Sequence, residues 1–369
     1  MSKQFKRILV KQGNTWAFAY CVCKNESSNS KSKGEKNKKI TVKQCKKENK
    51  ITVKEYLIAW FEHHKNFIEP ATANGYHVNI FNHIIPEIGD NQLSDLDVND
   101  IENMCLNLKK NKNLSAKTIK YVYNVLKVAL NKAVENKLIE SNVALQAKTP
   151  KVSKYNAVVL SPNQLKIMFN YVRNTRYETE IKLAAVLGLR RGEVLGIRNQ
   201  DVNFEKHTLS IQQQVSITKV INDSADDNKL FGIKNLKSSS SHRVIPISKD
   251  VENLIKRRQI YNNLQKSKLK DDYIDNDLLC CKDNGDIISP QALFRAFKEA
   301  LKKCELPNIR FHDLRHSYAT MLIDLNVPIK VISQNLGHSS IAVTDTVYAD
   351  SILAKKNASN AISSLLNCY

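Results

Sequence analysis

Four short segments in the second half of the chain carry cationic, imidazole and phenolic side chains at positions that core packing does not explain. They are Gly188-Leu189-Arg190-Arg191-Gly192-Glu193, Lys237 at the base of a Ser-rich turn, His312-Asp313-Leu314-Arg315-His316, and Leu336-Gly337-His338 followed by Tyr348. Guanidinium groups are permanently charged, bidentate donors that suit phosphate oxygens. A phenol can act as a nucleophile where a base and nearby cations help it lose its proton. These residue types predict chemistry on an anionic substrate.

Taken singly, each segment also has a purely structural explanation. Glu193 stands three residues after Arg190, on the same side of a helical turn, and could simply form an ion pair with it. Lys237 could be a solvated turn residue, and Tyr348 could be an ordinary half-buried tyrosine. The segments become informative only through their combination and their order.

The spacing of His312 and His316, four residues apart, invites comparison with the H-E-x-x-H zinc helix of metalloproteases. Asp313 stands where that helix needs glutamate, and Arg315 would place a cation beside the metal. We therefore expect no metal site here, and we expect His316 to be a packed residue near the start of a helix.

The ordered set resembles the tyrosine recombinases of the phage and transposon integrase type. Their pattern is an arginine box, a lysine in a β-turn, H-x-x-R, L-G-H and a tyrosine nine or ten residues later. By this resemblance the catalytic residues would be Arg190, Lys237, His312, Arg315, His338 and Tyr348. The two arginines would stabilise charge on the non-bridging phosphate oxygens while Tyr348 attacks the phosphorus atom.

The resemblance also implies how protons move. His312 would be the general base, His338 would donate to a phosphate oxygen, and Lys237 would protonate the departing 5′ oxygen. Glu193 would hold Arg190 or His312 in place. Because arginines would neutralise the phosphate and the covalent link would conserve the energy of the broken bond, we expect neither a metal nor a nucleotide cofactor. The sequence contains no G-x-x-x-x-G-K-[ST] loop.

The chain is strongly basic, with 57 Lys and Arg against 36 Asp and Glu among 369 residues and a formal charge of +21. This excess favours a polyanionic partner, double-stranded DNA first of all. The N-terminus lacks the apolar core of a signal peptide, and no stretch reaches the about 18 apolar residues of a membrane span. The eight cysteines show no paired C-x-x-C spacing. We expect a cytoplasmic, nucleoid-associated protein with reduced thiols and no membrane partner.

Hydrophobic periodicity indicates a multidomain chain. Residues 1–50 combine a strand-like segment with a basic loop, and the resemblance implies a small β domain for arm-type DNA sites. Residues 51–147 show amphipathic stripes and predict an all-α domain of about four helices, which the resemblance implies is a core-binding domain. The first stripe comprises Val53, Tyr56, Leu57, Trp60 and Phe61. Residues 148–157 indicate a linker. Residues 158–369 indicate a mixed α+β domain, which the resemblance implies is the catalytic domain with a C-terminal tail.

Local signals within these regions predict one helix start and three DNA contacts. Ser161-Pro162-Asn163-Gln164 has the N-cap, proline and glutamine of a capping box. Lys117 and Lys120 lie off the apolar stripe of a helix, and Arg243 lies in the strand-like run HRVIPIS. We expect these three cations to contact DNA phosphates.

By resemblance, the chain would be a site-specific recombinase that integrates or excises a mobile element. It would act as a homotetramer on two synapsed attachment sites, through a 3′-phosphotyrosyl intermediate and a Holliday junction. An excisionase and a DNA-bending protein are further candidate partners. Two alternatives stay open: a non-catalytic DNA-binding accessory protein and a type IB topoisomerase-like enzyme. Leu187 and Asn199 depart from residues common in the family, Thr and Trp, and leave the subfamily undefined.

Overall fold

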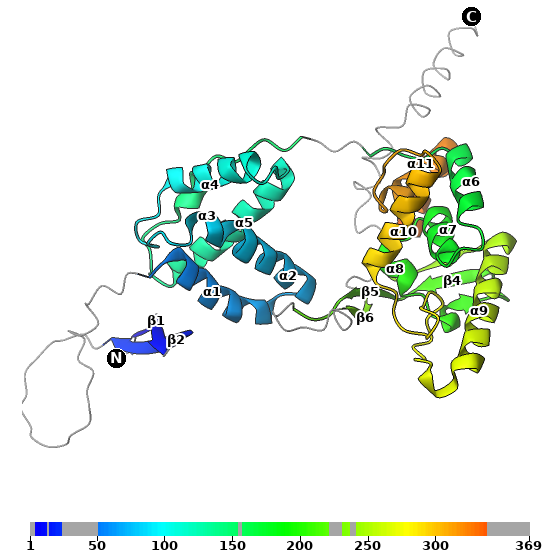
Figure 1. Ribbon diagram of the computed structural model, residues 1–369, viewed down its shortest axis with the longest axis horizontal. Coiled ribbons are helices and arrows are strands. Elements are labelled where there is room, and N and C mark those ends of the chain that lie inside the picture. Colours follow the sequence, from blue (N-terminus) through cyan, green and yellow to red (C-terminus); the bar gives the residue numbers. More distant parts are fainter. Residues whose placement is uncertain are drawn as a thin grey trace, which may run out of the picture. The chain divides into compact units, whose positions relative to one another are not determined.

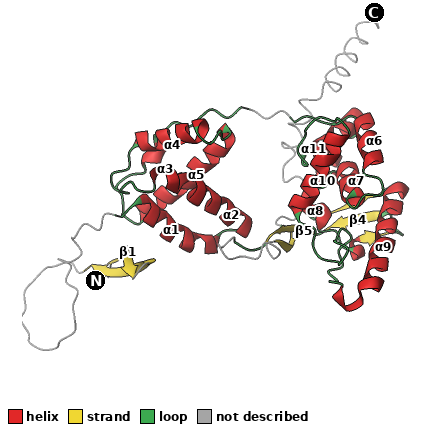
Figure 2. Cartoon of the chain, in the orientation of Figure 1, coloured by secondary structure: helices red, strands yellow, loops and turns green. Residues whose placement is uncertain are grey.

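The computed structural model describes the backbone of residues 4–12 and 15–23, and residues 51–153, 157–220, 231–236 and 241–337 (Figures 1 and 2). The chain separates into two compact units, Met1–Lys154 with Val220–Asn222, and Tyr155–Lys219 with Asp223–Tyr369. Three of the predicted catalytic residues, Lys237, His338 and Tyr348, lie outside the described residues, as does the predicted basic loop after residue 23.

The alternating segment near the N-terminus forms a two-stranded antiparallel hairpin of β1 (Gln4–Gln12) and β2 (Thr15–Cys23). Its register runs from Gln4 opposite Cys23 to Gln12 opposite Thr15. The prediction of strands here is confirmed. The arm-binding role of this hairpin stays a prediction.

The described residues of the first unit from residue 51 onward are mainly helical (Figure 2). Its main elements are α1 (Val53–His64), α2 (Pro70–Asn79), a π-helical turn (Ile80–Ile84), α3 (Ile85–Ile88), α4 (Val98–Lys110) and α5 (Ala116–Glu135). The predicted stripe from Val53 to Phe61 is buried in their common core. The Tyr56 hydroxyl donates a 2.6 Å hydrogen bond to the Ala129 carbonyl and ties α1 to α5. The prediction of a helical region is confirmed.

The second unit combines helices with two small antiparallel sheets. Its helices are α6 (Pro162–Tyr171), α7 (Glu178–Leu187), α8 (Arg191–Leu195), α9 (Lys249–Leu269), α10 (Pro290–Lys303), α11 (Asp313–Asp324) and α12 (Ile329–Leu336). α6 begins as predicted, because Ser161 Oγ accepts from the Gln164 amide while Gln164 Oε1 accepts from the Ser161 amide. The prediction of a mixed α and β region is confirmed.

One sheet of this unit has the strand order β3 (Val202–Asn203), β4 (Thr208–Ile211), β7 (Arg243–Pro246). β5 (Gln213–Ile217) pairs with β6 (Phe231–Asn235) in a separate hairpin. In β7, buried and exposed residues alternate from Arg243 onward, so that Arg243 faces inward with Ile245. Among the described helices, none is both long and apolar enough to cross a membrane.

Candidate active site

A glycine turn places Arg190 at the start of α8. Gly188 ends α7 with φ 62°, in the left-handed region that favours glycine. A Cβ atom on Gly188 would lie 2.5 Å from Cδ1 of Tyr318 and 2.7 Å from Cδ2 of Leu336, so the site also has no room for a larger residue. Arg190 then adopts an extended conformation as the N-cap of α8. The turn thereby places Arg190 between the end of α7 and the start of α8.

Glu193 binds Arg190 twice and is itself fully buried. Its carboxylate accepts from the Arg190 backbone amide at 2.9 Å and from Arg190 Nη1 at 2.6 Å. It also accepts from Arg243 Nη2 at 2.8 Å and from Arg243 Nη1 at 3.3 Å. Burial alone would raise the pKa of Glu193, but the hydrogen bonds and charge of Arg243, with the charge of Arg190, lower that pKa to about 2. Glu193 is therefore an anion at neutral pH, and it orients two arginines.

Arg315 lies on α11 and is almost completely buried. Its Nη1 donates a 2.9 Å hydrogen bond to the Gly188 carbonyl, and its Nη2 donates to the Leu336 carbonyl. Burial, and next the positive charge of Arg190, lower the pKa of Arg315 to about 9. The group nevertheless stays protonated at neutral pH, so two like charges are held close together.

Arg190 and Arg315 both donate hydrogen bonds to carbonyl groups at the C-terminal end of α12. While Arg315 donates to Leu336, Arg190 Nη2 donates to the next carbonyl, that of Gly337, at 3.4 Å. The structure therefore brings together the two arginines and Glu193, which stand in separate segments of the sequence. Two neighbouring guanidinium groups can bind one anion, such as a phosphate, at the same time.

His312 is the N-cap residue of α11, directly before the helix that carries Arg315. The side chain is exposed overall, yet surrounding protein atoms remove part of its water. This desolvation, together with the positive charges of His316, Arg315 and Arg190, lowers the pKa of His312 to about 4, and Asp313 opposes the effect. The imidazole is therefore neutral at pH 7 and able to accept a proton.

For the remaining predicted residues, the structure describes only the adjoining positions. Leu236, directly before Lys237, is buried, and Gly337, directly before His338, is the left-handed C-cap of α12. Tyr348 has no described neighbour in the sequence. The roles of these three residues stay predictions.

Comparison with known proteins assigns the family. The phage integrase family model matches residues 158–354, which is more than half of the chain, and the N-terminal SAM-like domain of phage integrases matches residues 52–108. The chain belongs to the phage integrase family. A tyrosine recombinase XerC-like protein of Caldanaerobacter subterraneus is 29% identical over 266 residues, covering 69% of this integrase and 67% of the relative. The integrase of Mycobacterium phage D29 is 24% identical, covering 79% and 72% of the two chains.

Solved structures of integrases share the fold of this integrase. The Tn1549 transposon integrase in complex with transposon right end DNA superposes with a TM-score of 0.68 at 20% identity, covering 85% of this chain and all of that one. A λ integrase tetramer bound to a Holliday junction gives a TM-score of 0.63 at 16% identity, with 81% and 78% coverage. The tyrosine-recombinase fold, with a helical N-terminal region and a mixed α/β catalytic region, is therefore shown for this chain. The integrase is a member of an enzyme family that carries out site-specific DNA recombination.

Arg243 has a different environment from the one predicted. In this integrase its side chain is 6% exposed and donates to Glu193, to the Ser241 carbonyl and to the Asn335 carbonyl. A buried, protein-bound guanidinium does not fit the predicted contact with DNA phosphate, and we withdraw that assignment. A sequence signal existed: Ile245 and Ile247 mark the inward face of a strand, and Arg243 falls on the same face.

The other two predicted DNA contacts have the expected surface position. Lys117 and Lys120 are exposed on α5 of the integrase, whereas Ile119 and Val122 of the same helix are buried. Their role in DNA binding stays a prediction.

His316 lies in the first turn of α11 and contacts His312 edge to face, with ring centroids 5.2 Å apart. It is partly buried, as expected of a packed residue near a helix start. Across the described part of the integrase, His, Cys, Asp and Glu form no group of three that could hold a metal ion.

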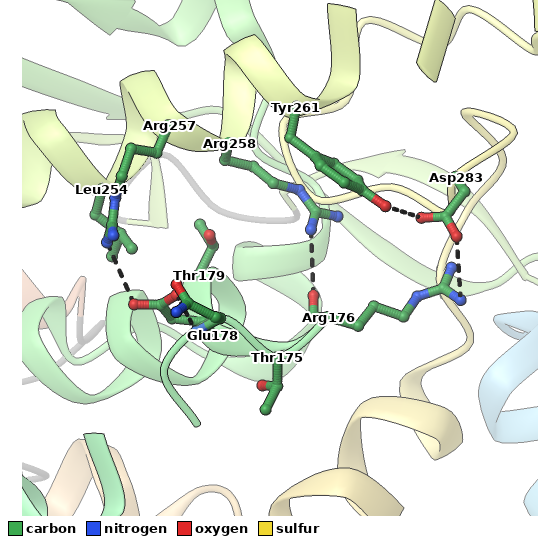
Figure 3. A pocket seen from close by; sticks show the side chains of 10 residues that line it. Thr175, Arg176, Glu178, Thr179, Leu254, Arg257, Arg258, Tyr261 and Asp283 are labelled. Carbon is green, nitrogen blue, oxygen red and sulfur yellow. Dashed lines mark hydrogen bonds and ion pairs between the residues drawn. The ribbon is translucent and has the colours of Figure 1, made fainter. Parts of the chain in front are cut away.

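A cavity of about 370 Å³ lies at the other end of α7, where the helix starts at Glu178 (Figure 3). Its charged side chains bind one another. Arg257 pairs with Glu178 at 3.2 Å, Arg176 lies 4.0 Å from Asp283, and Arg258 donates to the Arg176 carbonyl at 3.2 Å. The contacts of Arg257 and Arg258 join α9 to the start of α7 and to the residue that precedes it by two positions, and we assign the cluster a structural role in the integrase.

Proposed function

We propose that this integrase cleaves and rejoins DNA at specific sites by transferring a 3′ phosphate to Tyr348. The observation that carries the proposal is the convergence of Arg190 and Arg315 beside the end of α12, with His312 at the start of the helix that holds Arg315. Two rigid, permanently charged forks at one place suit the negative charge that develops on the non-bridging oxygens during phosphoryl transfer.

The local charge supports the same proposal. Three guanidinium groups, those of Arg190, Arg243 and Arg315, surround a single buried carboxylate, that of Glu193. The cluster therefore has an excess of positive charge in a partly desolvated place, where electrostatic interactions are stronger than in water. A DNA phosphate would neutralise this excess, and the mutual repulsion of the arginines favours its binding.

The proposed reaction moves two protons. The Tyr348 oxygen bonds to phosphorus as the bond to the 5′ oxygen breaks, His312 takes the phenolic proton, and Lys237 protonates the 5′ oxygen. His338 donates a hydrogen bond to a phosphate oxygen. Rejoining is the reverse: a 5′ hydroxyl of the partner strand attacks phosphorus and releases the tyrosine. The neutral state of His312 at pH 7 suits a proton acceptor.

The proposal extends to the assembly. Residues 1–50 would bind arm-type sites, residues 51–147 and 158–369 would hold the core site on either side of the 148–157 linker, and four copies would act on two attachment sites through a Holliday junction. The division into two compact units near residue 154 supports the proposal that two separate units of the chain bind the duplex. An excisionase and a DNA-bending protein would control direction.

A plasmid assay tests the function as a whole. Two attachment sites of the chain's own element are placed on one supercoiled plasmid and incubated with the integrase and an extract of the host. We expect recombinant circles together with four-way junction intermediates.

Other outcomes of this assay point to the two alternatives. A topoisomerase-like enzyme would relax the plasmid without forming recombinants. It would do so whether the plasmid carries one attachment site or two. Specific binding without any strand cleavage would indicate an accessory DNA-binding protein. Either result would overturn the proposal.

A further inference from the structure

Three successive carbonyl groups at the end of α12 each accept a hydrogen bond from an arginine of a different segment. The pairs are Arg243 Nε with Asn335 at 2.7 Å, Arg315 Nη2 with Leu336, and Arg190 Nη2 with Gly337 at 3.4 Å. We call these three contacts the arginine clasp. Two of its members are the predicted catalytic arginines, and the third, Arg243, has no role in the proposed reaction.

Helix geometry explains why these carbonyls need external donors. The last carbonyls of a helix have no partner within it, and the helix end carries partial negative charge. Gly337 turns the chain into the left-handed region, and its amide donates to the Gln334 carbonyl at 3.0 Å. The clasp supplies donors to the three carbonyls that follow.

Arg243 differs from the other two arginines because it joins both parts of the cluster. Its Nε holds the Asn335 carbonyl, while its Nη atoms hold both oxygens of Glu193. Glu193 in turn holds the backbone amide and the guanidinium of Arg190. A continuous path of hydrogen bonds therefore runs from the end of α12 through Arg243 and Glu193 to Arg190.

We propose that Arg243 is a positioning residue for DNA cleavage, an inference that rests on the proposed function. Through Glu193 it limits how strongly the carboxylate holds Arg190, and through Asn335 it fixes the end of α12, where Arg315 and Arg190 also bind. Without Arg243, the whole negative charge of Glu193 acts on Arg190 and draws its guanidinium away from the phosphate. Arg243 itself is buried, and the donors of its guanidinium group bind protein acceptors.

The geometry also predicts how the conservative variant behaves. Lysine has a single ammonium group and cannot reach Asn335 and both Glu193 oxygens with the fixed fork that arginine provides. Arg243→Lys keeps the charge beside Glu193 but loses the bridge to α12. We therefore expect Arg243→Lys to retain more activity than Arg243→Gln.

The test is the single-turnover rate of covalent protein–DNA adduct formation on a nicked suicide substrate of the element's own site. Arg243→Gln should slow this step roughly a hundredfold and Arg243→Lys roughly tenfold, as expected for small misplacement of reacting groups. The matched control is Arg258→Lys, because Arg258 is equally buried in the same unit but binds at the far end of α7. Circular dichroism and active-fraction titration give the folded, active fraction of each variant. Per folded molecule, the control should cleave at the wild-type rate.

A second substrate separates positioning from general damage. In a substrate with a methylphosphonate at the scissile position, one charged oxygen is replaced by a neutral methyl group, so less charge stabilisation by Arg190 is needed. The loss caused by Arg243→Gln should shrink strongly on this substrate. An equal loss on both substrates, or wild-type rates on both, would overturn the inference while leaving wild-type adduct formation intact. If the wild type forms no adduct, the proposed function fails, and the inference fails with it.

Discussion

Arg315 donates a 2.9 Å hydrogen bond to the carbonyl of Gly188, two residues before Arg190. This contact joins α11 to the turn between α7 and α8, so the turn that orients one arginine is fixed by the other. Gly188 has φ 62°, so the carbonyl that binds Arg315 belongs to a residue in the left-handed region. The turn before Arg190 therefore combines a glycine conformation with a bond from the second arginine.

Replacing Gly188 with alanine should disrupt this arrangement. Alanine at φ 62° is strained, and its Cβ atom would overlap Tyr318 and Leu336. We expect Gly188→Ala to lower the free energy of unfolding by about 1–3 kcal/mol, measured by urea denaturation. An unchanged midpoint would show that the turn can relax and does not fix the two arginines.

Glu193→Gln should destabilise the integrase because Arg243 would keep a buried charge without its anionic partner. The depressed pKa of Glu193, about 2 against an ordinary 4.5, corresponds to about 3 kcal/mol of stability at pH 7. Since the folded pKa is the lower one, this contribution is complete above about pH 5 and is lost as the pH falls toward 2. The measurement is the difference in urea unfolding free energy between wild type and variant at pH 7 and at pH 3.5.

The expected difference is larger at pH 7 than at pH 3.5. Glu205→Gln is the control, because Glu205 is exposed in the same unit. A difference that does not change with pH would show that Glu193 is not held as an anion by its arginines.

The pKa of His312 should respond to Arg190. In the DNA-free integrase, we expect an imidazole NMR titration to place this pKa near 4, well below the ordinary value of 6.5. Arg190→Ala removes one of the positive charges that lower it, so the pKa should rise. Arg191→Ala is the neighbouring control and should leave it where it is, since Arg191 is not among the groups that shift His312. Equal responses to the two variants would contradict the proximity of His312 and Arg190.

Lys117 and Lys120 should contribute to DNA affinity but not to sequence specificity. If each contacts one phosphate, the double alanine variant should reduce the slope of log K against log salt by about 1.8 for duplex DNA. Lys268→Ala is the control, since Lys268 is exposed on α9 in the other unit. Titrations of specific and random duplexes at several salt concentrations measure the slope. A slope equal to that of wild type would remove both lysines from the DNA interface.

Local sequence signals predicted the elements that local physics controls. The capping residues Ser161 and Gln164 and the apolar stripe of α1 depend on neighbours within one or two helical turns, and both predictions are confirmed. β6 was not predicted, because Phe231–Asn235 shows no clear alternation and becomes a strand only through pairing with β5. Pairing between distant segments is set by tertiary structure, which periodicity does not reveal.

In the candidate site, too, contacts between residues close in sequence could be predicted, whereas contacts between distant segments could not. Glu193 was predicted to hold Arg190 or His312, and it binds Arg190, which lies one helical turn away. Its second partner, Arg243, is 50 residues away and reaches it from another element, so spacing gave no indication of the pair. The burial of Arg315 and its bonds to the carbonyls of Gly188 and Leu336 also depend on how α7, α11 and α12 meet.

In the proposed reaction, the phenol of Tyr348 forms a covalent bond to DNA. The most direct measurement is denaturing electrophoresis of the integrase after reaction with a nicked suicide substrate, followed by mass spectrometry of the peptide that carries the nucleotide. We predict a heat-stable adduct at Tyr348 in the wild type, no adduct in Tyr348→Phe, and a normal adduct in the control Tyr171→Phe, an exposed tyrosine of α6. An adduct that persists in Tyr348→Phe, or one that maps to another residue, would contradict the account.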